Sequence, residues 1–303
     1  MASSQVPAWP DVVPASSKGA GMFVTRYEDV SQDGRIALRA LSNGIGAAVW
    51  RATLLRHPAY AVLRDTGILP ILARLVLEGG GGPISVGSDV SAEGTFVLTR
   101  AVDARGEARM RIDMWADMTG IAGCSHGPGP ANAGQSIPLG RMYAEQVLTR
   151  PFAPPDQRKV SVLPEDHGLE ERRADWSVPE GLLALPEGAS WIEGEAGGEQ
   201  PDPSTTVFGV GHTDSNQHVN SLVYPLLLEE AALRWAHQAW GAAPRFARFV
   251  ELRYRKPFFA GETCRVILRG YRAEADVIGV LARFVAPGSE DRPHAYARLE
   301  LAT

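Results

Sequence analysis

The stretch Gly211–Trp240 constrains the fold of this chain more than any other part of the sequence. It opens with polar residues at every second position, which are His212, Asp214, Asn216, His218 and Asn220. In an extended backbone, side chains two and four residues apart point the same way. We therefore expect Asp214, Asn216 and His218 to converge on one small volume, whereas on a helix the same spacing would scatter them.

An apolar pattern with helical spacing follows this polar segment directly. Its apolar members are Leu222, Leu226, Leu227, Leu233 and Trp240, and the polar residues between them include Glu229, Glu230, Arg234 and His237. The pattern predicts a long, mostly buried helix, with Pro225 in or just before its first turn. Because unpaired N–H groups and the helix dipole favour negative charge at a helix N-terminus, the polar cluster would lie where developing negative charge is stabilised.

These residues resemble the signature of the plant and bacterial acyl-ACP thioesterases. The motif is Asp-x-Asn-x-His-Val-Asn followed by Val-Tyr, and its members here are Asp214, Asn216, His218, Val219, Asn220, Val223 and Tyr224. Proteins of that family are double hotdogs, in which each of two domains is a long helix wrapped by an antiparallel sheet. The resemblance implies an α+β double hotdog whose site lies in the second domain, after a strand expected at Thr205–Val210.

The chain departs from the family pattern at three places. His212 stands where the family usually has Asp, and Ser221 stands where it has a second Asn. Pro257 and Phe258 follow the strand expected at Leu252–Lys256, where the family has an acidic or Cys residue. The third catalytic group of the family is therefore missing from its usual place. The acidic residues that remain as replacements are Glu229, Glu230 and Glu262.

The motif offers groups suited to hydrolysis of a thioester. His218 is the expected general base, because only histidine titrates near neutral pH without a large shift. Asn216 would orient the water or the carbonyl, and Asp214 would hold the arrangement or fix the imidazole tautomer. Backbone N–H groups near Val219 and Asn220, at the helix start, would supply an oxyanion hole. The residues expected to bind the substrate are Val219, Asn220 and Tyr224. In the alternative interpretation, Asp214 and Asn216 only cap a turn and the helix.

Size and composition limit the other functions. The 303 residues suffice for two domains of about 150 residues each, and the net charge of -5 argues against a nucleic-acid binder. Cys124 and Cys264 are far apart, so they predict neither a disulfide framework nor a metal site, and Cys264 is not expected to be a nucleophile. The sequence predicts no cofactor and no membrane span. The N-terminus lacks a signal-peptide pattern, so a cytoplasmic protein is expected.

The N-terminal half repeats the order strand, turn, helix. A strand is expected from Met22, and apolar residues recur at helical spacing between Ile36 and Leu55. Placing Asp29 on Asp214, at an offset of 185 residues (214 − 29), puts Ser31, Asp33 and Arg35 on Asn216, His218 and Asn220. The sequence thus predicts a duplicated unit whose first copy has lost the Asn and His.

The chain is expected to divide into four segments. We expect residues 1–20 to form a flexible N-terminal arm, 21–150 the first hotdog, 151–203 a Pro/Glu-rich linker and 204–303 the second hotdog. The protein would be a monomeric pseudo-dimer or a homodimer.

A run of basic residues bears on the partner. Eight of them lie between positions 245 and 272, against only two acids, and they are Arg245, Arg248, Arg253, Arg255, Lys256, Arg265, Arg269 and Arg272. A positive face would attract an acidic acyl carrier protein or the phosphates of CoA. The alternative is a solvated sheet face, because Glu251, Arg253 and Arg255 alternate with apolar residues.

The leading hypothesis is a thioesterase that hydrolyses an acyl or polyketide thioester on acyl carrier protein or CoA, in fatty acid or polyketide biosynthesis. Hotdog hydratases and dehydratases have a motif that resembles Asp-x-Asn-Pro-x-His. Here the spacing from Asp214 to His218 is one residue shorter, and no Pro follows Asn216. Transfer of the acyl group to an alcohol or amine would use the same site. A hotdog without its third catalytic group would also serve as a non-catalytic acyl-binding protein.

Overall fold

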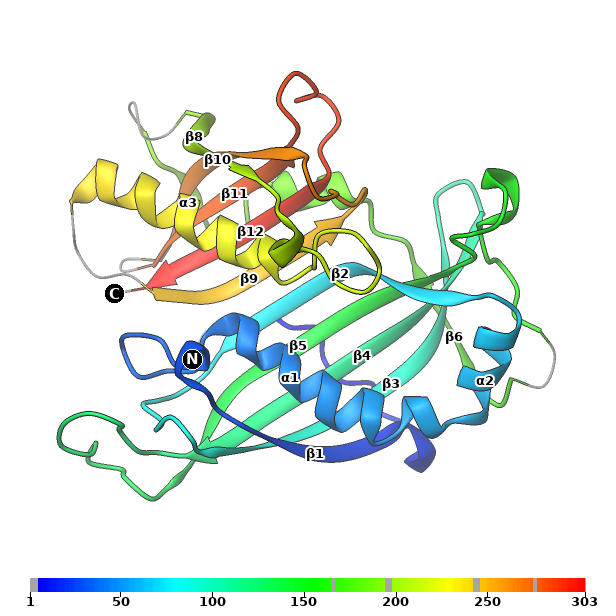
Figure 1. Cartoon of the computed structure of the whole chain (residues 1–303), viewed down its shortest axis with the longest axis horizontal. Coiled ribbons are helices and arrows are strands. Elements are labelled where there is room, and N and C mark those ends of the chain that lie inside the picture. The colour runs from blue at the N-terminus through cyan, green and yellow to red at the C-terminus, as the bar shows by residue number, and fades with distance from the viewer. Residues whose placement is uncertain (1–4, 165–166, 194–197, 242–245, 275–276, 303) are drawn as a thin grey trace. The chain divides into compact units, whose positions relative to one another are not determined.

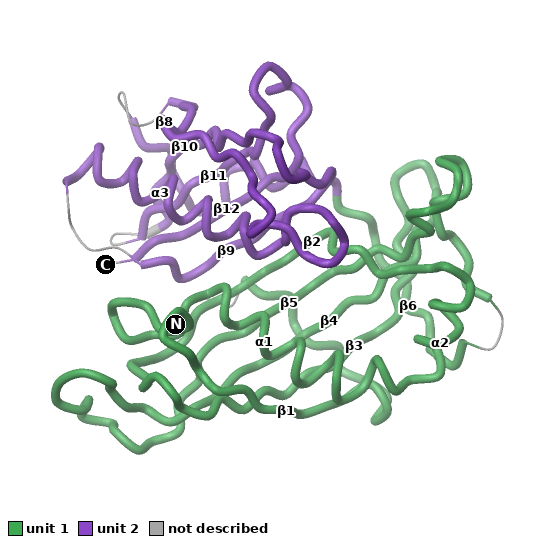
Figure 2. The backbone as a smooth tube through the Cα atoms, viewed as in Figure 1, with its two compact units in different colours: residues 1–177 green, residues 178–303 purple. Residues whose placement is uncertain are grey.

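The computed structural model describes residues 5–164, 167–193, 198–241, 246–274 and 277–302. The chain divides into two compact units, residues 1–177 and 178–303, which Figure 2 shows in different colours. Each unit combines a helical segment with an antiparallel sheet (Figure 1). The division falls inside the segment that the sequence presents as a linker.

The first unit is built on a sheet of long strands. Its strands are β1 (Lys18–Val24), β2 (Leu69–Gly79), β3 (Asp89–Val102), β4 (Ala108–Ile121), β5 (Ser136–Thr149) and β6 (Glu171–Asp175). They are ordered β1-β3-β4-β5-β2, and β6 runs parallel to the second half of β3. The helical segments are η1 (Ala15–Ser17), η2 (Tyr27–Asp29), η3 (Leu38–Leu41), α1 (Ser42–Ile45), η4 (Gly46–Arg51), η5 (Leu54–Arg56), α2 (Pro58–Asp65) and η6 (Pro155–Gln157). The predicted helix between Ile36 and Leu55 is present, but it is divided into 3-10, α and π turns.

Small residues let the helical segment of the first unit lie close to its sheet. A Cβ added to Gly19 would lie 2.2 Å from the carbonyl oxygen of Ala48, and one added to Gly21 would lie 2.7 Å from that of Ala47. Gly94 on β3 faces the side chain of Ala48 in the same way. The spacing between helix and sheet therefore depends on glycine and alanine, since any larger side chain would push the two apart.

The second unit repeats this plan with a regular helix. Its elements are η7 (Pro179–Leu183), β7 (Ser190–Trp191), β8 (Gln200–Val207), η9 (Val210–His212), α3 (Val223–Trp240), β9 (Phe246–Tyr254), β10 (Thr263–Glu274), β11 (Val277–Val285) and β12 (Ala295–Ala302). The sheet is ordered β9-β12-β11-β10, and both β8 and β7 pair with the far edge of β10. The strand expected at Leu252–Lys256 forms the end of β9, which stops at Tyr254.

Helix α3 confirms the helical pattern of the motif. Pro225 is its third residue, where a missing N–H breaks no hydrogen bond. Its buried residues are Tyr224, Pro225, Leu228, Ala231, Ala232, Trp235 and Ala236. The ring of Trp235 lies over Gly270 of β10, and Gly241, at a φ of 79°, ends the helix. No helix within the described ranges is long and apolar enough to cross a membrane.

The two units share an internal repeat, but its register differs from the predicted one. A 3-10 turn precedes each loop, at Tyr27–Asp29 and Val210–His212, and an isolated bridge closes each loop, Val30 to Ile36 and Thr213 to Val219. These features give an offset of 183 residues (213 − 30), so the offset of 185 is wrong by two positions. The corrected pairs are Asp29 with His212, Ser31 with Asp214, Asp33 with Asn216, Arg35 with His218 and Ala37 with Asn220.

Segments that precede each first strand cover part of each sheet. In the first unit, Trp115 Nε1 donates to the carbonyl of Pro7 at 2.9 Å, and Thr95 Oγ1 donates to that of Ser17 at 3.1 Å. In the second unit, η7 contacts β9, β11 and β12, and the Arg269 guanidinium stacks 3.7 Å from the ring of Trp191. The described part of the N-terminal arm is therefore packed on the sheet, and part of the expected linker covers the second sheet.

Replacement of Gly270 by Val is expected to destabilise the second unit. An added Cβ would lie 2.0 Å from the ring of Trp235, and overpacking of this kind costs about 1–3 kcal/mol. Gly46→Ala is the control, because nothing lies within 4 Å of its added Cβ. Urea denaturation measures both variants, and equal stability of Gly270→Val and the parent protein would contradict the packing described here.

Candidate functional site

The polar motif forms a tight turn rather than an extended strand. The N–H of Asp214 donates to the carbonyl of His218 at 3.2 Å, and the N–H of Gln217 donates back to that of Asp214 at 2.9 Å. Gln217 has a φ of 65°, as the last residue of a three-residue hairpin loop requires. The prediction of an extended segment is wrong, because polar residues at every second position also fit a short loop.

Asp214 holds this loop through both carboxylate oxygens. Its Oδ1 accepts the backbone N–H of Asn216 at 2.8 Å, and its Oδ2 accepts the side-chain amide of Asn220 at 3.3 Å. Within the described residues, neither oxygen bonds the ring of His218. Of the two roles expected for Asp214, the structure therefore favours holding the arrangement over fixing the imidazole tautomer.

Asn220 and Val219 connect the loop to its surroundings. Asn220 Oδ1 accepts the N–H of Leu222 at 2.8 Å and thereby caps the start of α3. The N–H of Val219 donates to the carbonyl of Phe258 at 2.8 Å, and the N–H of Asn220 donates to that of His212 at 2.9 Å. These two N–H groups already have acceptors in the protein, so an oxyanion hole near the helix start would need other donors.

Asn216 and His218 are the motif residues whose side chains do not support the loop. Asn216 is exposed, and its side-chain amide has no hydrogen-bond partner in the described part of the chain. His218 is half-buried, and its Nδ1 lies 3.4 Å from the carbonyl oxygen of Val219. A proton on Nδ1 would face this carbonyl and leave Nε2 as the basic nitrogen. The loop thus presents one amide and one imidazole.

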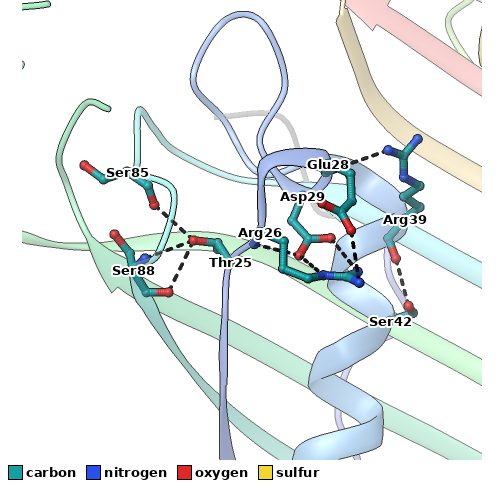
Figure 3. A network of polar contacts seen from close by, with 8 residues as sticks. All are labelled: Thr25, Arg26, Glu28, Asp29, Arg39, Ser42, Ser85 and Ser88. Atoms are coloured by element: carbon teal, nitrogen blue, oxygen red, sulfur yellow. Dashed lines mark hydrogen bonds and ion pairs between the residues drawn. The ribbon is translucent and has the colours of Figure 1, made fainter. Parts of the chain in front are cut away.

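The corresponding loop of the first unit explains the histidine at position 212. Figure 3 shows that the N–H of Arg26 donates to Asp29 Oδ2, at 3.0 Å. In the second unit the N–H of Gly209 donates to His212 Nδ1 at 2.9 Å, so His212 accepts the hydrogen bond that Asp29 accepts in the first unit. His212 therefore holds the 3-10 turn at the edge of the site.

The loop of the first unit has the same turn but lacks the Asn and His. The N–H of Ser31 donates to the carbonyl of Arg35 at 2.8 Å, and Gly34 takes the positive φ of 78°. Asp33 and Arg35 occupy the places of the amide and the imidazole, and Ser31 Oγ donates to Asp33 Oδ1 at 2.7 Å. The Asn and His are thus absent from the first copy in the corrected register as well.

Tyr224 and Phe258 form the wall behind the motif. Tyr224 is buried, which raises the pKa of its hydroxyl, and its Oη accepts the N–H of Phe258 at 3.4 Å. Its ring packs edge-to-face against Tyr254 and Phe284, each at 5.2 Å between centroids. Tyr224 therefore supports the loop from the core, while its contact with a substrate stays a prediction.

The structure of this chain is similar to several solved structures, although its sequence matches none of the known families. No family profile matches the sequence, and no curated relative matches it. A protein from Lactobacillus plantarum classed as an oleoyl thioesterase is similar in structure, with 13% identity, a TM-score of 0.60, and coverage of 95% of this chain and 96% of its own. An acyl-ACP thioesterase from Bacteroides thetaiotaomicron has 14% identity, a TM-score of 0.53 and coverage of 94% and 97%. The 12:0-ACP thioesterase of Umbellularia californica has 15% identity, a TM-score of 0.57 and coverage of 94% and 93%.

The chain has the fold of the acyl-ACP thioesterases. The double hotdog expected from the motif is thereby confirmed. The similarity covers both units, although the motif carried the resemblance only for the C-terminal third.

Three acidic residues of this double hotdog were expected to replace the missing third group. Glu262 is exposed, and its Oε2 accepts the N–H of Phe259 at 2.9 Å, within the turn that follows Phe258. Glu230 is exposed and forms an ion pair with Arg234 at 3.7 Å, whereas Glu229 is half-buried. Glu262 is thus the acid nearest in the chain to the wall, and Glu230 lies on the solvated side of α3.

Cysteine and metal chemistry have little support in the described residues. Burial raises the pKa of the Cys264 thiol to about 12, as its position within β10 leads one to expect. The described part of the chain contains no group of three His, Cys, Asp or Glu side chains that is arranged to hold a metal ion.

Acidic and aromatic residues compensate much of the basic run. Arg253 forms an ion pair with Glu251 at 3.1 Å, and Arg255 pairs with Glu180 at 2.6 Å. Glu251 is only 4% exposed, so the expected solvated face is wrong at this position, because η7 covers the strand. Arg245 lies outside the described residues. Lys256 is exposed, and the positive face is narrower than the sequence indicates.

His294 is a residue of the wall that sequence reasoning missed. Its ring stacks on Phe258 at 3.7 Å with an interplanar angle of 4°, and its Nδ1 lies 3.1 Å from the carbonyl oxygen of Pro257. Burial, and then the charge of Lys256, lower the pKa of His294. No periodic pattern marks a single histidine at the start of a strand, so no sequence signal was available.

The strained residue of the loop gives a prediction on stability. Gln217→Val is expected to be less stable than Gln217→Gly by about 1–2 kcal/mol, because a β-branched side chain opposes a positive φ. Chemical denaturation of the two variants measures this difference. Equal stability would show that the loop does not hold residue 217 in the left-handed region.

The lowered pKa of His294 gives a prediction on pH dependence. The folded protein favours the neutral ring, so the contribution of His294 to stability is complete above its ordinary pKa of 6.5 and is lost as the pH falls below that value. Denaturation at two pH values on either side of 6.5 should show a smaller acid-induced loss in His294→Phe than in the parent. The acid-induced loss of stability in His57→Phe is measured alongside it, because burial also lowers the pKa of His57. An unchanged loss in His294→Phe would contradict this assignment.

Proposed function

We propose that this protein hydrolyses the thioester of an acyl or polyketide chain carried on acyl carrier protein or CoA. The proposal rests on the observation that some residues of the motif loop hold its structure while others have side chains that do not support it. Asp214, Val219 and Asn220 hold the loop, and this leaves the Asn216 amide and the His218 imidazole for chemistry. The fold supports the proposal, since the similar proteins from Bacteroides thetaiotaomicron and Umbellularia californica are acyl-ACP thioesterases.

In the proposed reaction, His218 acts as general base toward water. The water oxygen attacks the acyl carbon while the imidazole takes up the water proton. The carbon–sulfur bond then breaks, and the thiolate leaves with the proton that the imidazole returns, so that one water and one thioester give one carboxylic acid and one thiol. Asn216 donates a hydrogen bond to the acyl carbonyl or orients the water, which replaces the oxyanion hole expected near Val219 and Asn220.

The missing third group favours a second candidate. Pro257 and Phe258 occupy the place of the family's third catalytic residue, and Phe258 is buried against His294 and Tyr224. A site with only an amide and an imidazole would also suit transfer of the acyl group to an alcohol or amine, or acyl binding without turnover. Glu262 is the residue we propose to test as a substitute acid.

His218→Ala is expected to lower kcat by about 100-fold or more, which is the range for loss of a general base. Thiol release from a panel of acyl-ACP and acyl-CoA thioesters measures the effect and sets the substrate class. Arg35→Ala is the matched control, because Arg35 occupies the corresponding position of the first loop and should retain activity. Equal activity of His218→Ala and the parent would contradict the mechanism. No thiol release from any thioester by the parent would contradict hydrolysis itself.

A further inference from the structure

The candidate site depends on the position of one residue, Phe258, that no strand of the second sheet contains. Phe258 lies between β9 and β10, yet its carbonyl accepts the N–H of Val219 at 2.8 Å, directly after His218. Its own N–H donates to Tyr224 Oη at 3.4 Å. A shift of Phe258 would therefore move Val219, the residue next to His218, and change the direction of the imidazole.

His294 contacts Phe258 through its ring and the preceding residue, Pro257, through a ring nitrogen. His294 is only 4% exposed, and its ring lies parallel to the Phe258 ring with 3.7 Å between the ring centroids. Its Nδ1 lies 3.1 Å from the carbonyl oxygen of Pro257, within hydrogen-bond distance. A neutral ring protonated on Nδ1 donates to this carbonyl while it stacks on the next residue.

The backbone of His294 is itself held firmly by the sheet. Its N–H donates to the carbonyl of Phe284 at 2.8 Å, and its carbonyl accepts the N–H groups of Arg255 and Lys256 at 2.9 and 3.1 Å. His294 thus links the edge of the β11–β12 pair to the segment that leaves β9. His294 directly precedes β12, and these three hydrogen bonds fix its backbone beside the sheet, as precise positioning of a site requires.

We propose that His294 is a positioning residue for the proposed hydrolysis: it holds Pro257 and Phe258, and through the Phe258 carbonyl it sets the orientation of His218. The inference rests on the proposed function for its effect on rate. Because His294 is buried, it acts through Phe258 and does not touch the substrate. The charged groups that act on its ring are Lys256 and Glu262, of which Lys256 favours the neutral form.

Two substitutions separate positioning from simple packing. His294→Phe keeps a flat ring that stacks on Phe258 but removes the donor to the Pro257 carbonyl. His294→Asn keeps a donor near the place of Nδ1 but removes the stacked ring. His57→Phe is the matched control, because His57 is a partly buried histidine of the first unit whose Nδ1 caps α2.

The test combines kinetics with amide hydrogen exchange at Val219, whose N–H bonds the Phe258 carbonyl. We expect His294→Phe to lower kcat about tenfold with little change in KM, because misplacement of a catalytic group slows the chemical step more than binding. Exchange at Val219 should become about tenfold faster, and His294→Asn should restore part of both losses. His57→Phe should change neither quantity.

Each outcome decides the proposal. Unchanged kcat and unchanged Val219 exchange in folded His294→Phe would overturn it. If His294→Phe does not fold, His294→Asn carries the test: a lower kcat and faster exchange at Val219 than in the parent support the proposal, and parental values of both overturn it. Parental kcat in His294→Asn with fast exchange at Val219 overturns the link to catalysis. If the parent hydrolyses no thioester, the proposed function fails, while Val219 exchange still decides whether His294 holds the loop.

Discussion

The hydrogen bond from the Val219 N–H to the Phe258 carbonyl joins the motif to the body of the second unit. The loop closes on itself through Asp214 and His218, but this bond fixes where the closed loop lies. The same bond removes the Val219 N–H from the list of oxyanion donors. In the proposed mechanism, structural support and chemistry therefore belong to different groups, and the side chains proposed for chemistry are those of Asn216 and His218.

The duplicated plan shows how the two copies differ. Both loops have the same closing hydrogen bonds and the same residue with positive φ, which is Gly34 in the first and Gln217 in the second. Glycine adopts this conformation without strain, whereas glutamine does not. Strain of this kind is typical of functional loops whose surroundings over-determine the backbone. The first loop keeps the relaxed residue and carries Asp33 and Arg35 where the second carries an amide and an imidazole.

Periodic patterns predicted the secondary structure of the second unit well. Helix α3 follows from the helical spacing of its apolar residues, whereas β11 and β12 are apolar runs that are buried over most of their length. The polar loop was predicted as an extended segment because a two-residue spacing fits both a strand and a hairpin turn. The repeat register slipped for a related reason, since it matched Asp29 to the nearest aspartate of the motif.

Long-range contacts determine the features that the sequence pattern did not predict. Glu251 alternates like a solvated residue, but the preceding segment covers its strand, and buried Glu251 pairs with Arg253. His294 lies 36 positions after Phe258 in the sequence and carries no pattern that links the two. Such contacts arise from the order of strands in the sheet, which local periodicity does not encode.

The most direct measurement is a crystal structure with an amide analogue of an acyl-pantetheine thioester, in which nitrogen replaces the sulfur. The account predicts that the acyl carbonyl oxygen lies within hydrogen-bond distance of the Asn216 amide, with His218 beside the acyl carbon. An analogue bound with its carbonyl away from both side chains would contradict the assignment of the site.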